Sequence, residues 1–590
     1  MSDSERETQL SQATLAHQQG NFSTAERIYR ELISQKTDPN IGYLLGTLLL
    51  QKGDYKGSID FLAPLAEKQY NSADLHNNLG VAYQSVGRRQ EAVKSFQNAL
   101  KCDQNYPQGW QNLGKILADL QHYSHSEQCY REVCRLLPED LAARQDWIQS
   151  LISAGMWSEA VEQIPMILEE SSLRPEELRS LRGHLAYAYS QLGDYAAAIP
   201  LNEQELDQEP DQTAILANLC FLYEHVGRIE DAIAAGEKAR DLAPQSAEVA
   251  NNLGVAYRSA HRFEDALSTF TLAEQLNPQL PLPAFNRGSL LLSLERFADG
   301  WPGYERRLEL TPQPEAWQKR TWWDGKPIPG KTLLIVCDQG FGDILMYARF
   351  LPRVRELSQA RTILQIPQEL TRLFQHARVG GLPLADQFVS EQESLPQADF
   401  LTPLMSAGQL LQLTPDQVTP SEPYLQVPSF SQRAGDKPVA TRARKIGLCW
   451  RGNAAQAQDH VRTLSLKKLC SLSDVPNVEW VSMQFDATEE ELQAWPGGLP
   501  VPEKKVMDFA DTANQLAGLD LLITVDTAIA HLAGALQTPV WTLLPHTPDW
   551  RWHWEESSVR WYPGMRLFRQ PAWGDWDQVL VEVQQALQSS

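Results

Sequence analysis

The chain has 590 residues, of which 43% are hydrophobic and 21% are charged, which predicts two or more folded domains and excludes a disordered or fibrous protein. Acidic residues outnumber basic ones by 41 to 25 over residues 1–300, and by 18 to 6 over residues 151–250. A surface of this sign repels phosphate groups, which argues against nucleic acid or an anionic membrane as the main partner.

The amino terminus shows neither the basic nor the apolar segment of a signal peptide, and no apolar run approaches the roughly 20 residues of a membrane span. The seven cysteines form no Cys-x-x-Cys pair, a pattern that favours reduced thiols over disulfides or a zinc site. These features predict a cytoplasmic protein without membrane insertion.

Residues 1–314 contain an internal repeat. Its anchor positions are spaced by 34 residues except for one step of 38, and they are Gly46, Gly80, Gly114, Ile148, Ala186, Cys220, Gly254 and Gly288. A small residue follows each anchor by twelve positions, and in several units an aromatic residue such as Phe96 or Phe270 follows by sixteen. The pattern resembles the tetratricopeptide repeat (TPR), which implies an all-α superhelix of about nine helix pairs with a concave face. The longer step predicts an irregular joint near residues 165–180.

The position two before the anchor carries a recurring asparagine, at Asn78, Asn112, Asn218, Asn252 and Asn286. In the TPR fold this position lies on the concave face, where an amide can both donate to and accept from a peptide backbone. The array resembles the asparagine ladder of O-linked N-acetylglucosamine transferase, which implies that these residues bind a protein acceptor. Alternatively, each asparagine bonds a neighbouring helix and stabilises the stack.

After Pro314 the 34-residue spacing stops, and short apolar runs alternate with helical stretches. The expected strands are Thr332–Cys337, Thr362–Ile366, Lys445–Trp450, Val478–Met483, Leu521–Val525 and Val540–Leu544. This alternation predicts α/β structure with parallel sheets. A Pro/Ser-rich linker at Thr419–Pro438 divides it into two Rossmann-like lobes, residues 315–430 and 440–590. The arrangement resembles GT-B glycosyltransferases, whose active site lies in the cleft between the lobes.

Gln339-Gly340-Phe341-Gly342-Asp343 follows the first expected strand and opens a helix, so that backbone amides can face an anion. The segment resembles the first motif of the lipopolysaccharide heptosyltransferase family, which implies that Asp343 is the catalytic base and that Gln339 and Gly340 lie at the donor. Alternatively, Asp343 is only a helix N-cap.

The segment Cys449–Leu466 is a polar loop after a strand of the second lobe. Asn453, Arg462 and Thr463 match the W-x-G-N…R-[ST] stretch of bacterial TPR-linked glycosyltransferases, a resemblance that implies contacts to the donor. A solvated loop that binds nothing is the alternative.

Thr524–Ala535 carries the strongest motif, in which a strand delivers Asp526 and Thr527 to the start of a helix. Asp526, Thr527 and His531 resemble the D-[ST]-x-x-x-H signature of the heptosyltransferase family, and Ala528 stands where many members have glycine. The resemblance implies that these four residues bind the donor's phosphate and sugar. A buried histidine satisfied by its neighbours is the alternative for His531.

Leu543–Gln570 is dense in tryptophan and arginine, which suits either stacking on a ligand ring or packing between lobes. Asp575-Trp576-Asp577 spells a DxD metal motif, but its place at the start of the final helix favours a cap. We therefore expect no metal and no cofactor, only a nucleotide-sugar donor.

The order of repeats followed by lobes resembles bacterial protein glycosyltransferases, including those that modify flagellin. It implies an inverting O-glycosyltransferase that moves a nonulosonic acid, such as pseudaminic or legionaminic acid, from its CMP donor to Ser or Thr of flagellin. Alternatives are another donor (UDP-GlcNAc, a GDP- or an ADP-sugar) acting on protein or polysaccharide, and a non-catalytic TPR scaffold.

Overall fold

A computed structural model describes residues 3–68, 72–169, 173–420, 423–425, 443–453, 459–502, 506–554 and 556–589. The chain forms two compact units, Met1–Gln208 and Glu209–Ser590, which we call the N-terminal and C-terminal units. Residues 170–172 of the expected joint, and residues 421–422 and 426–438 of the expected linker, lie outside the described residues.

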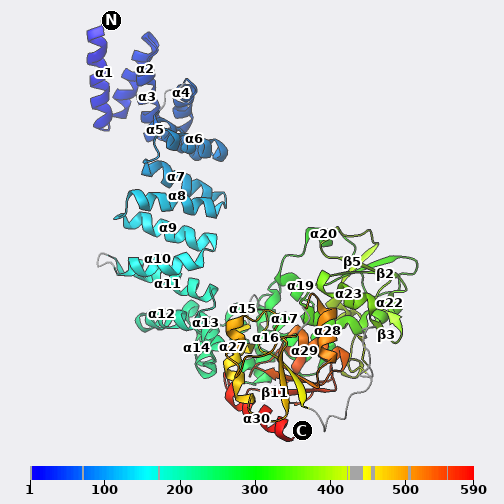
Figure 1. Ribbon diagram of the computed structural model, residues 1–590. Helices are drawn as coiled ribbons and strands as arrows, with labels where there is room; N and C mark the ends of the chain where they lie inside the picture. The colour runs from blue at the N-terminus through cyan, green and yellow to red at the C-terminus, as the bar shows by residue number, and fades with distance from the viewer. Residues whose placement is uncertain are drawn as a thin grey trace. The chain divides into compact units, whose positions relative to one another are not determined.

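The N-terminal unit is a stack of helix pairs (Figure 1). The helices are α1 (Asp3–Gln18), α2 (Phe22–Gln35), α3 (Pro39–Gln51), α4 (Tyr55–Glu67), α5 (Ala73–Ser85), α6 (Arg89–Cys102), α7 (Pro107–Asp119), α8 (Tyr123–Leu136), α9 (Leu141–Ala154), α10 (Trp157–Leu168), α11 (Pro175–Gln191) and α12 (Tyr195–Gln208).

Glycine anchors let the two helices of a pair approach closely. A Cβ atom at Gly80 of α5 would lie 2.5 Å from Cε1 of Phe96 on α6, and one at Gly114 would lie 3.1 Å from Cε2 of Tyr130. The aromatic ring therefore occupies the space that the missing side chain leaves. The predicted role of the small and bulky positions is confirmed.

One step of the repeat is 38 residues long instead of 34, and its extra residues extend helix α11. The anchor Ala186 lies 11 residues after the start of α11, whereas Gly80 lies 7 residues after the start of α5, a difference of 4. Four residues make about one α-helical turn. The irregularity thus includes an additional turn at the beginning of α11.

The C-terminal unit begins with further helix pairs: α13 (Thr213–His225), α14 (Ile229–Leu242), α15 (Ala247–Ser259), α16 (Phe263–Leu276), α17 (Pro281–Ser293) and α18 (Phe297–Tyr304), followed by the short helices α19 (Arg307–Leu310) and α20 (Glu315–Gln318). The buried aromatic residues Phe297, Trp301 and Tyr304 of α18 belong to the same hydrophobic core as the α/β region. The indole of Trp301 donates to the carbonyl of Leu413 at 2.9 Å. These last repeats are therefore part of the α/β body.

Lobe 1 contains a parallel sheet in the order β5-β2-β1-β6 and a small antiparallel pair, β3–β4. Its strands are β1 (Thr332–Val336), β2 (Arg361–Ile366), β3 (Arg378–Val379), β4 (Leu382–Pro383), β5 (Gln387–Ser390) and β6 (Phe400–Pro403). Its helices are α21 (Phe341–Tyr347), η1 (Ala348–Phe350), α22 (Leu351–Ser358), α23 (Gln368–His376), η2 (Leu404–Ser406), α24 (Ala407–Leu410) and η3 (Pro415–Gln417).

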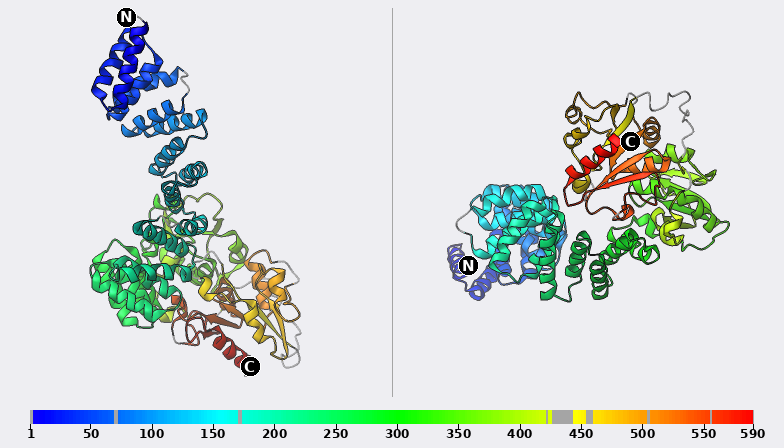
Figure 2. Two further views of the ribbon diagram at one scale, coloured as in Figure 1. Left: turned by 90° about the vertical axis from the view of Figure 1, so that its left-hand side faces the viewer. Right: turned by 90° about the horizontal axis from the view of Figure 1, so that it is seen from below.

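Lobe 2 is a parallel sheet in the order β11-β10-β9-β7-β8, with α30 beside β11 (Figure 2). Its strands are β7 (Arg444–Cys449), β8 (Val478–Ser482), β9 (Leu521–Val525), β10 (Val540–Leu544) and β11 (Met565–Arg569). Its helices are α25 (Asp459–Arg462), α26 (Leu466–Leu469), η5 (Cys470–Leu472), α27 (Glu489–Gln493), α28 (Phe509–Ala517), α29 (Ala528–Leu536), η6 (Trp550–Trp552) and α30 (Trp576–Ser589).

The predicted fold class, a helical repeat array followed by α/β structure, is confirmed. All six expected strands are present within one residue of their expected bounds, whereas β3 to β6 and β11 were not expected. In the described part of the chain, all seven cysteines are free, and no helix is both long and apolar enough to cross a membrane.

Candidate functional site

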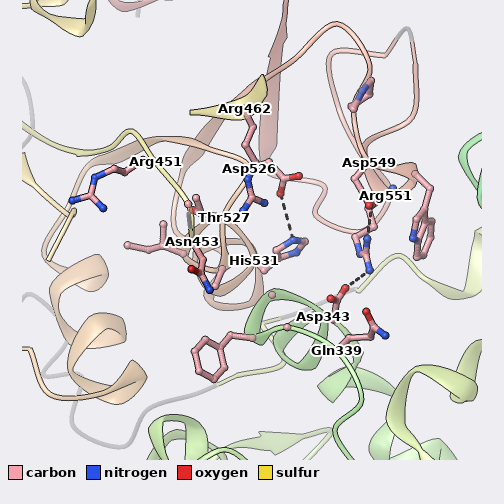
Figure 3. A pocket seen from close by; sticks show the side chains of 18 of the residues that line it. Gln339, Asp343, Arg451, Asn453, Arg462, Asp526, Thr527, His531, Asp549 and Arg551 are labelled. Atoms are coloured by element: carbon pink, nitrogen blue, oxygen red, sulfur yellow. Dashed lines mark hydrogen bonds and ion pairs between the residues drawn. The ribbon is translucent and has the colours of Figure 1, made fainter. Parts of the chain in front are cut away.

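One cavity of about 1240 Å³ lies in the C-terminal unit, and we call it the shared cavity. It is lined by the helices α13, α15 and α17 of the repeats, by the loop and helix after β1, and by loops after β7, β8, β9 and β10. In Figure 3 the side chains of Asp343, Asp526, His531 and Arg551 lie close together at its centre. Asn453 and Arg462 of the second motif also line the cavity, so residues of all three sequence motifs meet at one place.

Asp343 is the third residue of α21, whose N-cap is Gly340. Its carboxylate forms an ion pair with the guanidinium of Arg551, and the two side chains are 18% and 10% exposed. Burial raises the pKa of Asp343, and the charge of Arg551 opposes that rise. The N-cap alternative therefore does not describe Asp343. Gln339 and Gly340 are exposed and line the shared cavity.

Gly342 brings α21 against α29. A Cβ atom at Gly342 would lie 2.6 Å from Cδ2 of the His531 ring, closer than a side chain can approach. This contact joins the first motif of lobe 1 to the third motif of lobe 2. Glycine is required here by the close approach of an imidazole, because any larger residue would push the two helices apart.

The third motif folds as expected from its sequence. Strand β9 ends at Val525, Thr527 is the N-cap of α29, and Ala528 is its first residue. The Thr527 hydroxyl lies 3.1 Å from that of Thr524 and makes no capping bond to the helix. Asp526, Thr527 and Ala528 all line the shared cavity, so the start of α29 faces it.

His531 is buried among aromatic residues, with its Nδ1 2.9 Å from the Tyr562 hydroxyl and its ring 5.0 Å from that of Trp552. Its Nε2 lies 3.9 Å from a carboxylate oxygen of Asp526. Burial and the charge of Arg551 lower the pKa of His531 well below its usual range, so the ring is neutral. His531 thus has a bonded neighbour, as the alternative interpretation expects, and also lines the shared cavity.

Asp526 is ionised only above mildly acidic pH. Burial raises its pKa to about 6, the negative charge of Asp549 adds to the rise, and the charge of Arg462 opposes it. An aspartate with such a pKa in a cavity is a candidate functional group on physical grounds.

The second motif is organised by Asp459. Its carboxylate accepts from Nε of Arg462 at 3.1 Å and from the Thr463 hydroxyl at 2.9 Å. A Cβ atom at Gly452 would lie 2.5 Å from the Arg462 guanidinium. Arg462 and Asn453 line the shared cavity, whereas Thr463 is not among the described residues that line it. The predicted donor contact of Thr463 is thus replaced in this structure by its bond to Asp459. Residues 454–458 lie outside the described residues.

Asp549 and Arg551 were not predicted as site residues. The Arg551 guanidinium binds Asp549 as well as Asp343 (Figure 3). Between them, Trp550 packs edge-on against Trp301 and Tyr304 of the last repeat. The aromatic segment therefore packs between parts of the unit, while Asp549 and Arg551 line the shared cavity. The sequence signal for these two residues was their position beside Trp550 and Trp552 in the aromatic segment.

The regularly spaced asparagines form hydrogen bonds within the stack of repeats. The side-chain amide of Asn112 donates to Asn77 at 2.8 Å, and that of Asn286 donates to Asn251 at 2.9 Å. Equivalent bonds to the preceding repeat join Asn78 to Thr47 and Asn252 to the carbonyl of Ala217. These four residues thus bond neighbouring helices, as the alternative interpretation of the asparagines expects.

The asparagines differ in their relation to the shared cavity. Asn252 and Asn286 line it, and Asn218 is exposed but does not belong to its described lining. Asn78 and Asn112 lie in the other unit. Of these five asparagines, Asn252 and Asn286 combine a bond to the stack with a position in the lining of the shared cavity.

Asp575 accepts a hydrogen bond from the backbone N–H of Gln578 at 3.1 Å, in the first turn of α30. The cap interpretation of the DxD sequence is therefore confirmed. Among the described residues, no three His, Cys, Asp or Glu side chains are grouped so as to hold a metal ion.

Comparison with known proteins agrees with the two halves of the chain. Residues 488–560 match the model of glycosyltransferase family 9 (heptosyltransferase). Residues 73–106, 107–140, 184–247 and 222–281 match tetratricopeptide repeat models.

Three curated relatives share parts of the sequence. Protein FlbA of Caulobacter vibrioides is 26% identical over 49% of this chain and 52% of its own length. TPR repeat-containing protein YpiA of Bacillus subtilis is 24% identical over 30% of this chain and 41% of its own length. Tetratricopeptide repeat protein 12 of Mus musculus is 30% identical over 15% of this chain and 12% of its own length. The chain thus spans about half the length of FlbA and less of the others.

The family 9 match ends at residue 560 and includes Asp526, Thr527, His531 and Arg551. The predicted combination is confirmed: the chain carries tetratricopeptide repeats and a glycosyltransferase family 9 domain.

Proposed function

We propose that this chain transfers a sugar from a nucleotide donor to a hydroxyl group of a protein. The observation that carries the proposal is the shared cavity, because helices of the repeats and the motifs of both lobes line the same space. A donor and an acceptor segment can meet there without a further rearrangement of the described elements.

The donor's phosphate is expected at the start of α29. The backbone amides of its first turn face the cavity beside Arg462, and a helix start of this kind favours negative charge. Asp526 and His531 lie next to it and are suited to accept hydrogen bonds from sugar hydroxyls. Arg451, by contrast, is held by Asp486 at 2.6 Å and by Glu491 at 3.3 Å, which makes it a weaker candidate.

The acceptor is expected along α13, α15 and α17. Apolar side chains on these helices, including Phe221, Val255, Leu282 and Phe285, line the shared cavity beside the amides of Asn252 and Asn286. Phe221 is 40% exposed and Leu282 is 38% exposed. Apolar surface interspersed with amides suits a peptide segment better than a polysaccharide, which offers many hydroxyls and little apolar surface.

The proposed reaction is an inverting displacement in a GT-B arrangement. Asp343 takes the proton of the acceptor hydroxyl, whose oxygen forms a bond to the anomeric carbon of the sugar. The bond from that carbon to the phosphate oxygen breaks, and the phosphate leaves with the electron pair. The N-terminal amides of α29 and Arg462 stabilise the charge on the leaving phosphate, as oxyanion donors do in other enzymes.

For the finer identity of the substrates we propose a CMP-linked nonulosonic acid, such as pseudaminic or legionaminic acid, and a flagellin acceptor in the cytoplasm. The support is the resemblance of the domain order to bacterial flagellin glycosyltransferases. A metal-independent reaction fits the proposed use of amides and arginine for the phosphate.

The test starts from the full chain. We expect calorimetric titration with CMP-, UDP-, GDP- and ADP-sugars to identify one binding class, and intact-mass measurement to show that sugar added to flagellin Ser or Thr. Asp343→Asn should bind the same donor and transfer it about 10²–10⁴ times more slowly. Failure of every nucleotide sugar to bind would favour the scaffold alternative. Transfer to polysaccharide but to no protein would contradict the proposed acceptor.

A further inference from the structure

Arg551 lies at the point where the proposed base and the proposed donor site meet. Its guanidinium bonds the carboxylates of Asp343 and Asp549, and its centre lies 4.7 Å from the ring of Trp550. Its Nε is buried and has no hydrogen-bond partner among the described residues. Arg551 also lines the shared cavity, where a planar guanidinium can donate hydrogen bonds to a bound anion.

The positive charge of Arg551 also reaches the donor motif. It opposes the rise in the pKa of Asp526 that burial causes, and it adds to the lowering of the pKa of His531 by burial, so its charge acts on both side chains. A phosphate or carboxylate that binds beside Asp526 would therefore be attracted by the same guanidinium. Arginine is suited to such an exchange because its planar fork can hold one anion by two parallel hydrogen bonds.

The pair with Arg551 restrains Asp343 as a base in the donor-free protein, because the guanidinium occupies its carboxylate and opposes the rise in pKa that burial causes. A carboxylate that accepts a charge-assisted hydrogen bond is stabilised in its ionised form and takes a proton less readily. For Asp343 to accept the proton of the acceptor hydroxyl, this bond has to weaken. The structure thus holds the proposed base in a restrained state.

We propose that donor binding releases this restraint, because the anionic group of the nucleotide sugar takes Arg551 away from Asp343. Asp343 then faces the acceptor hydroxyl only when a donor is present. Asp549 keeps its bond to Arg551 and guides the guanidinium from one partner to the other. The inference rests on the proposed function and adds to it an order of events, with the donor bound before the base is active.

Competition between Asp343 and the donor for Arg551 has a measurable consequence. Removing the carboxylate in Asp343→Asn frees the guanidinium, so the donor should bind roughly three- to tenfold more tightly, as expected for residues in direct contact. Simple loss of repulsion between two negative groups would also tighten binding. A variant that lacks the Arg551 guanidinium separates the two causes, because competition requires this guanidinium and charge repulsion does not.

The experiment is a double-mutant cycle of donor affinity in the full chain, by calorimetry. The variants are Asp343→Asn, Arg551→Gln and the double variant. The probes are CMP-N-acetylneuraminate and UDP-N-acetylglucosamine, with CMP and UDP as their sugar-free counterparts. Arg551→Gln alone should weaken binding at least tenfold. In the Arg551→Gln background, Asp343→Asn should leave the affinity unchanged. An effect seen with the free nucleotide identifies the phosphate as the competing anion, and one seen only with CMP-N-acetylneuraminate identifies the sugar carboxylate.

Arg560→Gln is the matched control, because Arg560 lies in the same segment, pairs with Glu295, and is not among the described residues that line the shared cavity. Its donor affinity should equal that of the wild type. If Arg551→Gln does not fold, Arg551→Lys replaces it, since lysine keeps the charge but loses the fork, and the coupling should fall at least threefold.

Two results would overturn the inference alone: unchanged affinity in Arg551→Gln, or tightening by Asp343→Asn that persists without Arg551. Absence of binding of any nucleotide sugar to the wild-type chain would overturn the proposed function as well.

Discussion

Asp526 lowers the stability of the fold that holds it. Its pKa rises from 3.8 to about 6 on folding, chiefly by burial. Between these two values the folded chain binds a proton that the unfolded chain has lost, so stability falls as the pH rises through this range. Above pH 6 the loss is complete and amounts to roughly 3 kcal/mol at most, at about 1.4 kcal/mol for each pKa unit.

Asp526→Asn should therefore stabilise the C-terminal unit at neutral pH. We expect its thermal transition to lie above that of the wild type at pH 7.5, and the difference to disappear near pH 4. Scanning calorimetry across this range measures the difference directly. The same variant should weaken donor binding. Melting temperatures that run parallel at all pH values would show that burial does not perturb Asp526 as described.

Asn112 and Asn286 form a matched pair for separating stacking from acceptor binding. Both donate to the asparagine 35 residues earlier, but only Asn286 lines the shared cavity. Substitution of either by alanine should destabilise its own unit by about 1–2 kcal/mol, because a buried acceptor loses its partner. Asn286→Ala should in addition raise the KM for the protein acceptor, measured with the donor at saturation. Equal KM values for both variants would assign the asparagines to the stack alone.

At the scale of elements, the contact of α21 with α29 fixes the distance between the two lobes' motifs. Gly342→Ala should destabilise the C-terminal unit by about 1–3 kcal/mol, the usual cost of overpacking, and should weaken donor binding by displacing His531. Chemical denaturation and calorimetry measure these two effects. Gly183 is a suitable control, since it also lies in a helix and a Cβ atom there would meet nothing within 4 Å. Gly183→Ala should be neutral or slightly stabilising, and equal effects of the two variants would argue against the close contact.

The sequence predicts elements well where one local pattern decides them. Repeat spacing locates the helix pairs, and runs such as Leu521–Val525 locate fully buried strands. It misses β6, which ends in proline, and β11, in which two of the five residues are arginine. Both strands exist because a neighbouring strand pairs with them, which is information from the tertiary structure.

The residues of the site, like the elements, are predictable from the sequence where a local motif contains them. Asp343, Asp526 and His531 stand in local motifs, and the structure brings them together. Arg551 lies 208 residues from Asp343 along the chain, so no local pattern could pair them. The asparagine ladder shows the converse, because a regular spacing was visible but its bonds to the preceding repeat were not.

At the scale of the whole molecule, the division at residue 208 assigns the last repeats to the catalytic body. Arg307 of α19 binds Asp338, after β1, at 2.9 Å, and both side chains are almost fully buried. Removing Arg307 would leave a buried carboxylate with an unpaired charge, which typically costs about 3–5 kcal/mol. Removing α18 would also strip Trp301 from the common core.

A chain of residues 209–590 should therefore fold and bind nucleotide sugar with an affinity within about threefold of the full chain, as expected when no described cavity residue is lost. A chain of residues 315–590 should instead be insoluble or melt at a much lower temperature. Circular dichroism melting and calorimetry test both. A stable 315–590 chain with full donor affinity would show that the last repeats are dispensable for the donor site.

The boundary after α12 also separates the repeats that can be altered from the unit that contains the shared cavity. None of the described residues that precede Glu209 lines the shared cavity, so we expect that the number and surface of these repeats can be changed without altering the cavity. If the repeats recruit the acceptor as proposed, a change in this part should alter which proteins are recruited. Helices α13, α15 and α17 line the shared cavity, and α17 and α18 also contribute to the core of the α/β region. Grafting a foreign repeat array onto Glu209 is thus the natural way to redirect the enzyme to a new target.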